Sequence, residues 1–408
     1  MNPRARGAWR PLLDGAQADR ARETLDALAG ALDGELAAVA SPALLDGAAS
    51  RALVFAYLDR AWPDRGHAER TARWLDRAVE RLAEQPMAEG LYAGFTGVAW
   101  VVEHLAEDCA DSDADAADAS AAIDDELRDR LRGAPGTGLD HDLTDGLTGL
   151  GVYALERLPR ASGAELLALV VERLCEAAET HGDGVTWRST PERMLAETRA
   201  EYPSGYHDMG VAHGVPGPIA LLAGACAAGV AGPRARPLLD GAWRWMLANR
   251  LPPGEGSTFP LWQCADRPAQ PARSAWCYGD PGAARAMFVA ARAIGSEPWA
   301  RVALAIARQA TARPRDRCGC DDPGLCHGAA GLAHLANRMW QDTGDPTFAD
   351  AARGWYDDAL AMPRPDDPSF LTGAAGIALA LAAALAPVEP AWDRVLLASL
   401  PPPRSRST

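Results

Sequence analysis

Three residues that bind soft metal ions stand just before glycines that begin helix-like stretches: Cys277 in WCYG, and Cys326 and His327 in LCHG. A catalytic zinc ion takes three protein ligands of this kind and keeps its fourth position for water or substrate. Two thiolates already balance the charge of the ion, so it would activate water weakly, whereas a thiol bound there would lose its proton and stay nucleophilic. A single buried cysteine is usually an inert apolar residue. The shared position before a glycine instead predicts a zinc site that favours sulfur chemistry over hydrolysis.

A histidine and an aspartate occupy related positions further upstream. His213 precedes a glycine in AHGVPG, and Asp142 stands four residues before Gly146 in DLTDGLTG. A lone histidine is more often structural, and His213 could also be a fourth metal ligand, but an imidazole with a reference pKa of about 6.5 suits proton transfer. Asp142 is either a helix N-cap, a position for which Asp145 competes, or the carboxylate that orients His213. We expect His213 to act as an acid or base, with Asp142 beside it.

Two residues near Cys277 are further candidates. Arg273 stands four residues before it, and Tyr278 follows it directly. Arg273 would form either a surface ion pair or a fixed cation for a developing enolate oxygen. Tyr278 would either donate a hydrogen bond in the site or pack against it.

Other potential ligands fit the pattern less well. Cys318 and Cys320 form a CxC close to Cys326, but neither precedes a repeat glycine. We expect them to lie in a flexible loop beside the site, although they could compete as ligands or hold a second metal. His207 is close to His213 in sequence and ranks second to it as the acid-base residue.

These residues are positioned by a recurring unit, in which two glycines three residues apart open an Ala/Leu-rich stretch of helical length. The first glycines of the seven copies are Gly47, Gly94, Gly146, Gly214, Gly279, Gly328 and Gly373. Intervals of 45 to 68 residues between them leave room for a second helix in each unit, which is typical of helical-hairpin arrays. The pattern predicts an all-α fold, an α/α toroid of seven inner and seven outer helices. The glycines would allow close backbone approach where the inner helices converge.

The outer helices should be amphipathic, as the stretch from His67 to Glu84 illustrates. One stripe of this stretch carries Trp74, Leu75, Ala78, Val79 and Leu82, with Arg and Glu residues opposite. The stripe predicts a helix that covers an apolar inner helix with these five side chains.

We expect residues 1–400 to form one toroid domain and residues 401–408 to form a disordered tail. The motif GDGVTW, from Gly182, predicts a small inserted β-hairpin or subdomain within about residues 180–205. The acidic run from Glu107 to Glu126 reads most simply as a solvated surface loop, because like charges repel.

The composition excludes several classes of protein. A formal net charge of −15 argues against nucleic-acid binding, which needs a basic face. No apolar run is long enough for stable membrane insertion, and the start, from Met1 to Arg4, lacks the apolar stretch of a signal peptide. The eight scattered cysteines do not resemble a disulfide framework and are expected to be reduced. We therefore expect a cytoplasmic protein.

The motifs WCYGDPG, LCHGAAG and AHGVPG, with GxxG helix starts over most of the chain, resemble those of the lanthionine synthetase C-like cyclases of the class I lantibiotic type. The first repeat, DGAASR, departs from the pattern because it lacks the second glycine. The resemblance implies a toroid whose central zinc is held by Cys277, Cys326 and His327. It also implies functional roles for Asp142, His213, Arg273 and Tyr278.

The activity implied by the resemblance is the addition of cysteine thiols to dehydroalanine or dehydrobutyrine in a ribosomal precursor peptide, which forms thioether rings. The implied partners are that dehydrated peptide, a separate dehydratase and a transporter. No dehydratase or kinase-like segment precedes the repeats, so we expect a stand-alone cyclase.

Two other functions remain open. A zinc-containing relative without activity could bind thiols such as glutathione or scaffold a peptide-modifying complex, but it would not need His213, Asp142 and Arg273. An α/α-toroid glycosidase or epimerase would need paired acidic residues at the inner helix starts, where this chain has cysteines and histidines.

Overall fold

The computed structural model describes residues 8–106, 118–133, 140–194 and 196–402. The start of the chain, most of the acidic run and the tail from residue 403 lie outside this part. Two compact units form: one from Met1–Met87 with Gly319–Trp392, the other from Ala88–Cys318 with Asp393–Thr408. Each is described by itself, and the expectation of a single domain stays a prediction.

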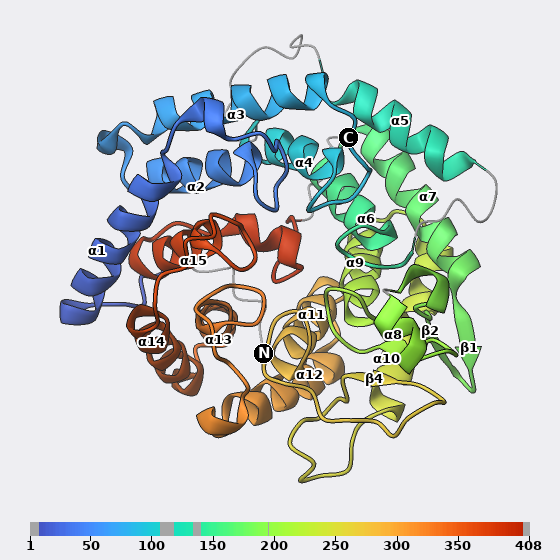
Figure 1. Cartoon of the computed structure of the whole chain (residues 1–408). Helices are drawn as coiled ribbons and strands as arrows, with labels where there is room; N and C mark the ends of the chain where they lie inside the picture. The colour runs from blue at the N-terminus through green and yellow to red at the C-terminus, as the bar shows by residue number, and fades with distance from the viewer. Residues whose placement is uncertain (1–7, 107–117, 134–139, 195, 403–408) are drawn as a thin grey trace. The chain divides into compact units, whose positions relative to one another are not determined.

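The first unit consists of helices packed in pairs, with α2 against α3, α13 against α14 and α15 against α1 (Figure 1). Their bounds are α1 Gly15–Leu32, α2 Ala48–Ala61, α3 His67–Glu84, α13 Ala329–Thr343, α14 Pro346–Ala361 and α15 Ala374–Leu385. One helix of each pair is apolar nearly all round, and every residue of α15 is buried. The apolar helix is therefore the core element of its pair, as the repeats predict.

The second unit repeats the same pairing and adds two small antiparallel sheets. Its helices are α4 Phe95–Ala106, α5 Ala121–Arg132, α6 Leu147–Glu156, α7 Ala161–Ala177, α8 Ala196–Glu201, α9 Pro216–Ala227, α10 Gly232–Ala248, α11 Asp280–Ala293 and α12 Glu297–Thr311. Its strands are β1 Glu179–His181, β2 Gly184–Thr186, β3 His207–Asp208 and β4 Trp262–Gln263. Helix α6 packs on α7, α9 on α10, and α11 on α12.

The expected hairpin is present as β1 and β2, in which Glu179 pairs with Thr186 and His181 with Gly184. Gly182 adopts the left-handed conformation that its turn needs, with a φ of 63°. The hairpin packs against α10 where a Cβ on Gly184 would lie 2.9 Å from the Cβ of Trp245. Whether residues 180–205 are an insertion into the repeat array stays a prediction.

The repeat glycines are required by the loop that leads into each apolar helix. A Cβ on Gly279 would lie 2.0 Å from the Arg273 carbonyl oxygen, and one on Gly214 would lie 2.2 Å from that of Asp208. The same clash, with the carbonyl six residues upstream, occurs at each first glycine of the repeats. From the third repeat onward the second glycines show the same close approach, and a Cβ on Gly376 would lie 2.0 Å from the Phe370 oxygen. The close approach is thus between a helix and its own entry loop, rather than between converging helices as the sequence suggested.

We expect Gly376→Ala to lower the free energy of unfolding by at least about 2 kcal/mol, because backbone must move to admit the new methyl group. The matched control is Gly30→Ala on α1, where a Cβ would meet nothing within 4 Å. That change should stabilise the protein by up to about 1 kcal/mol, since alanine is the better helix former. Thermal and urea unfolding midpoints measure both, and equal effects would contradict this account of the glycines.

Helix α3 covers α2 as expected, but its buried stripe is shifted. Trp74 and Ala78 are buried, whereas Leu75 and Leu82 are half-buried. Val79 is 49% exposed, so the prediction that it lies on the buried stripe is wrong. The stripe is centred on residues 67, 71, 74 and 78, and Val79 lies about 100° round the helix from Ala78.

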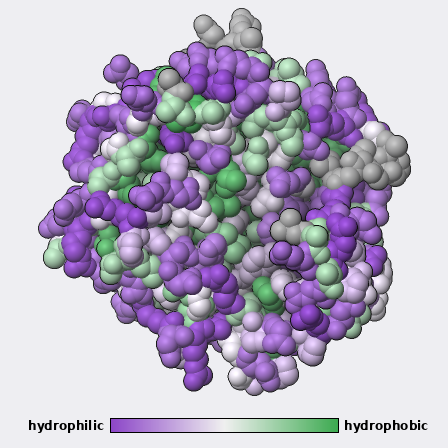
Figure 2. Space-filling model, in the orientation of Figure 1, coloured by the Kyte–Doolittle hydropathy of each residue, from purple (hydrophilic) through white to green (hydrophobic). Residues whose placement is uncertain are grey.

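Polar residues cover most of the face of the molecule that is shown in Figure 2.

The described part of the acidic run is not a solvated loop. From Ala121 it forms α5, and Asp124 is 1% exposed. Asp124 pairs with the fully buried guanidinium of Arg157, which also lies 3.0 Å from Glu103 and 2.5 Å from Asp118. The hydrogen bond from Arg157 holds the pKa of Asp118 below its ordinary value, although burial opposes it. The sequence pattern missed this network because Arg157 is far from the run in sequence.

Arg157→Ala should lower the free energy of unfolding by about 3–5 kcal/mol, because it leaves the Asp124 carboxylate buried without its cation. Arg22→Ala, which removes an exposed pair with Asp19, should cost at most about 1 kcal/mol. Urea unfolding of the two variants measures the difference. A small effect at Arg157 would mean that Asp124 finds water or becomes protonated at little cost.

A buried segment at residues 393–400 completes the core of the second unit. Three side chains from that unit donate hydrogen bonds to its carbonyl oxygens: Tyr92 to Val395 at 2.8 Å, Trp276 to Leu396 at 2.8 Å and Arg285 to Ala398 at 2.6 Å. Arg394 in the segment pairs with the buried Glu156 at 2.6 Å. The segment therefore braces the loop that carries Cys277.

No helix in the described part of the chain is both long and apolar enough to cross a membrane. The cytoplasmic location stays a prediction.

Candidate metal and acid-base site

The entry loops of α6, α9 and α11 are joined edge to edge by backbone hydrogen bonds. Leu143 N–H donates to the Ala212 carbonyl at 2.9 Å, and Ala212 N–H donates to the Cys277 carbonyl at 3.4 Å. The three helices also lie side by side, with α9 between α6 and α11 (Figure 1). Residues that stand shortly before the glycines of neighbouring entry loops are thereby brought together.

This arrangement places His213 against Asp142. The Nδ1 atom of His213 contacts Oδ2 of Asp142 in a short ion pair. The other oxygen, Oδ1, accepts from the hydroxyl of Thr144 at 2.7 Å and from the backbone N–H of Asp145 at 2.9 Å. No side chain caps α6 at Gly146, so neither Asp142 nor Asp145 acts as its N-cap. Asp142 instead holds the turn with one oxygen and the imidazole with the other.

The ion pair shifts the pKa values of both His213 and Asp142. Burial opposes a charge on His213, but the hydrogen bond and charge of Asp142 outweigh it and raise the pKa of His213 to about 9. Burial also opposes ionisation of Asp142, yet the His213 hydrogen bond and charge hold its pKa below the ordinary value. The pair is therefore an imidazolium carboxylate near neutral pH, with an imidazole side chain that is 40% exposed.

Cys277 and Tyr278 lie directly beside this pair. A Cβ on Gly210, in the loop of His213, would lie 2.2 Å from the Cys277 carbonyl oxygen and 2.8 Å from Cδ1 of Tyr278. The rings of His213 and Tyr278 are 5.7 Å apart. Cys277 is 6% exposed. Burial, and then the nearby carboxylate of Asp208, raise the pKa of the Tyr278 hydroxyl, which therefore stays a proton donor.

Asp208 is a member of this group that the sequence reasoning missed. It is fully buried, and its Oδ1 accepts from the N–H of Gly210 at 2.7 Å. Burial raises its pKa to about 7, against the Gly210 hydrogen bond and the charges of His213 and His141. The sequence did contain a signal for Asp208, because this residue stands six residues before the repeat glycine Gly214. Asp322 and Asp367 occupy that place in their repeats and form the same turn, so Asp208 is first of all a turn residue.

The remaining candidates of this unit lie in three places. Arg273 is half-buried in the entry loop of α11. Cys318 is 2% exposed at the end of a 3₁₀ turn, and its carbonyl accepts from the N–H of Ser274 at 2.8 Å. His207 lies with Glu179 and His181 rather than with His213. That Arg273 stabilises an enolate oxygen stays a prediction. That the loop of Cys318 is flexible also stays a prediction.

In the first unit, Cys326 and His327 stand together at the start of α13. Cys326 Sγ and a ring nitrogen of His327 lie within 4.8 Å of each other. Nε2 of His327 lies 3.4 Å from Oδ2 of Asp322, which is longer than a normal hydrogen bond. In the described residues, no group of three ligands includes Cys318 or Cys320.

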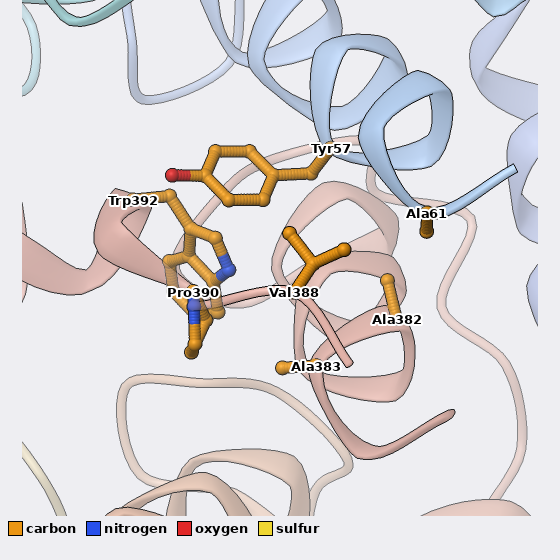
Figure 3. Close-up of a pocket in the computed structure, with 7 residues that line it drawn as sticks. All are labelled: Tyr57, Ala61, Ala382, Ala383, Val388, Pro390 and Trp392. Carbon is orange, nitrogen blue, oxygen red and sulfur yellow. The ribbon is translucent and has the colours of Figure 1, made fainter. Parts of the chain in front are cut away.

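The first unit also contains a small apolar pocket between α2, α15 and the segment after α15. Tyr57, Ala382, Val388 and Trp392 are among its lining residues (Figure 3). The pocket is lined by no carboxylate, imidazole or thiol, so it is no candidate for metal binding or acid-base catalysis.

Comparison with known proteins places this geometry in a family. The family model for lanthionine synthetase C-like proteins matches residues 38–397. Nisin biosynthesis protein NisC from Lactococcus lactis subsp. lactis is 24% identical over 280 residues, a match that spans 65% of each chain.

The solved structure of a nisin cyclase superposes with a TM-score of 0.77 at 20% identity, covering 93% of this chain and 97% of that one. At this identity the likeness shows the fold, and it confirms the predicted all-α fold of the α/α-toroid class. The family match extends over nearly all seven repeats and both groups of candidate residues. The chain therefore belongs to the lanthionine synthetase C-like family.

Proposed function

We propose that this chain is a zinc-dependent cyclase acting on a dehydrated ribosomal precursor peptide. It would add cysteine thiols across the double bond of dehydroalanine or dehydrobutyrine and so form thioether rings. The observation that carries the proposal is the His213–Asp142 ion pair in the loop next to Cys277 and Tyr278. A protein that only binds thiols has no need of such a pair. Family membership supports the same activity, and NisC is itself named for nisin biosynthesis.

Cys277, Cys326 and His327 would hold the zinc. Their donor chemistry fits, since two thiols and one imidazole leave a fourth position open. The burial of Cys277 and the closeness of Cys326 Sγ to a ring nitrogen of His327 support this assignment. When bound, the ion lowers the pKa of a substrate thiol and presents it as a nucleophile.

His213 is assigned as the acid. Addition of sulfur to the β-carbon leaves an enolate, and the α-carbon must then receive a proton. With a pKa of about 9, His213 carries that proton at neutral pH, and Asp142 fixes the ring through Nδ1 so that Nε2 is left to donate. Of the two roles that the sequence left open, the structure thus favours general acid over general base.

Tyr278 and Arg273 would stabilise the enolate oxygen. The raised pKa of Tyr278 keeps its hydroxyl protonated, so it can donate a hydrogen bond as charge develops. Arg273 would add a fixed positive charge from the same entry loop. The proposed partners are the dehydrated peptide, a separate dehydratase and a transporter, and the proposed location of this chain is the cytoplasm.

The test is a cyclisation assay with zinc-loaded protein and a leader-bearing peptide that a dehydratase has treated. Ring formation leaves the mass unchanged, so it is scored as loss of free thiols that react with an alkylating reagent. We expect fewer alkylations per peptide with time, and thioether fragments by tandem mass spectrometry. Glutathione binding without any ring formation, across several dehydrated peptides, would favour the thiol-binding module instead.

A further inference from the structure

A second group of potential metal ligands lies in the β-containing part of the second unit. Glu179 and His181 are two residues apart on β1, and His207 is the first residue of β3. Alternate residues of a strand point to the same face, so Glu179 and His181 project together. One ligand atom from each of the three residues lies within 4.8 Å of the others.

The distances in this cluster are close to those between ligand atoms of one metal ion. Oε2 of Glu179 lies 3.4 Å from Nε2 of His181 and 3.7 Å from Nε2 of His207. Hydrogen bonds between nitrogen and oxygen are normally about 2.7–3.2 Å long. Two donors on a tetrahedral zinc, each about 2.0–2.1 Å from the ion, are about 3.3–3.4 Å apart. The spacing of the carboxylate oxygen from His181 is that of two donors on one ion, and its spacing from His207 is a few tenths of an ångström wider.

The orientation of His207 supports this reading. Its Nδ1 lies 3.2 Å from the carbonyl oxygen of Trp187, to which it can donate its proton. That hydrogen bond selects the tautomer whose Nε2 lone pair faces Glu179, as is common for histidines bound to metals. The two imidazole rings are 4.9 Å apart at 77°, so they meet edge to face rather than stacked. Burial lowers the pKa of His207, which keeps the ring neutral near pH 7.

One nearby cation opposes metal binding. Arg188 Nε donates to the other oxygen of the same carboxylate, Oε1 of Glu179, at 3.0 Å. The guanidinium reduces the negative charge that a divalent ion would meet, but it leaves Oε2 facing the imidazoles. The site should therefore bind metal more weakly than a site with two thiolates.

We propose that Glu179, His181 and His207 form a second metal site, which binds a divalent transition-metal ion of the zinc, cobalt or nickel type. Two imidazoles and one carboxylate suit such ions. The ion would tie β1 to β3, the strand that contains Asp208 and leads into the loop of His213. His181 is 47% exposed, so the remaining coordination positions face water.

The test is a titration of metal-free, full-length protein with Co²⁺, followed by absorption spectroscopy. We expect two equivalents to bind: one with a thiolate charge-transfer band and a second, weaker one without it. Cys277→Ala should keep the second equivalent, whereas His181→Ala should weaken it by at least about a hundredfold, the upper range for losing even an outer-shell contact. The two sites are scored separately, so failure of the proposed cyclase function would leave this result intact.

Matched variants make the outcome decisive. Glu176→Gln removes an exposed carboxylate paired with Arg173 and should leave the second equivalent unchanged. Arg188→Gln should tighten it several-fold by removing the competing cation. Unchanged circular dichroism of metal-free His181→Ala would exclude unfolding as the cause of its loss. Absence of a second equivalent in wild type, or its survival in a Glu179→Gln/His181→Ala double variant, would overturn the proposal.

Discussion

Cys277→Ala is expected to lose the zinc bound with high affinity and to lower the cyclisation rate by about a thousandfold or more. The physical reason is that the ion contributes several kcal/mol of transition-state stabilisation, and each 1.4 kcal/mol is worth about tenfold in rate. Cys277 is buried at the start of α11, so the variant removes one donor without exposing a large surface. Elemental analysis and the thiol-alkylation assay measure the two effects on the same preparation.

Cys318→Ala is the control for this prediction. Cys318 is equally buried, but it belongs to no group of potential ligands in the described residues. The Cys318→Ala variant should keep its zinc and most of its cyclisation activity. If Cys277→Ala instead retained a full equivalent of tightly bound zinc, the ligand assignment would be wrong, whatever the activity.

His213→Asn should lower the cyclisation rate by about 10²–10⁴-fold, the usual contribution of a general acid. It should leave the zinc content unchanged, because His213 is not assigned as a ligand. This separates it from Cys277→Ala, in which metal and activity are lost together. A variant that loses zinc would show that His213 closes the metal site as a fourth ligand. A variant that keeps its full rate would remove His213 from the mechanism.

The same residue predicts a pH dependence. The pKa of His213 is raised to about 9 in the folded protein, so the acid form is present at neutral pH and is lost as the pH rises through that value. Activity should therefore fall on the alkaline side. The ion pair should also stabilise the fold fully below about pH 6.5, the unfolded pKa, and lose this effect as the pH rises towards 9.

In Asp142→Asn the fall of activity at alkaline pH should begin at a lower pH than in wild type. The reason is that the Asp142 carboxylate supplies the main interactions that raise the pKa of His213. A bound zinc ion would lower the pKa of His213 in every variant, so the comparison is made at equal metal loading. Asp145→Asn changes an exposed carboxylate three residues away, and it should shift the alkaline fall of activity much less. Identical pH profiles for wild type and Asp142→Asn would contradict the assigned partnership.

The repeat glycines made most of the fold predictable from the sequence. GxxG followed by an apolar stretch marked where each core helix begins, and the structure starts these helices at or just after those glycines. The same register placed Cys277, Cys326, His213 and Asp142 within four residues before a repeat glycine, so all four were expected in the entry loops of core helices. What the glycines do there was less evident, because a clash with a carbonyl six residues upstream depends on the path of the loop.

Features that depend on distant partners were not predictable. Periodicity could not show that Asp124 meets Arg157, because no sequence pattern encodes a pair 33 residues apart. Asp208 looked like one more turn aspartate, and only its complete burial beside Tyr278 distinguishes it from Asp367. The cluster of Glu179, His181 and His207 joins two separate small sheets, and His207 follows His181 by 26 residues, so sequence spacing could not reveal it.

The division of the two units along the chain has a consequence for how the protein is made. The first unit needs both residues up to Met87 and the helices after Gly319, and the second is completed by the buried segment at 393–400. During synthesis, neither core can close until residues up to about 400 have left the ribosome. The apolar helices of the early repeats therefore stay exposed until partners far along the chain are translated, which makes the unfinished chain prone to aggregation.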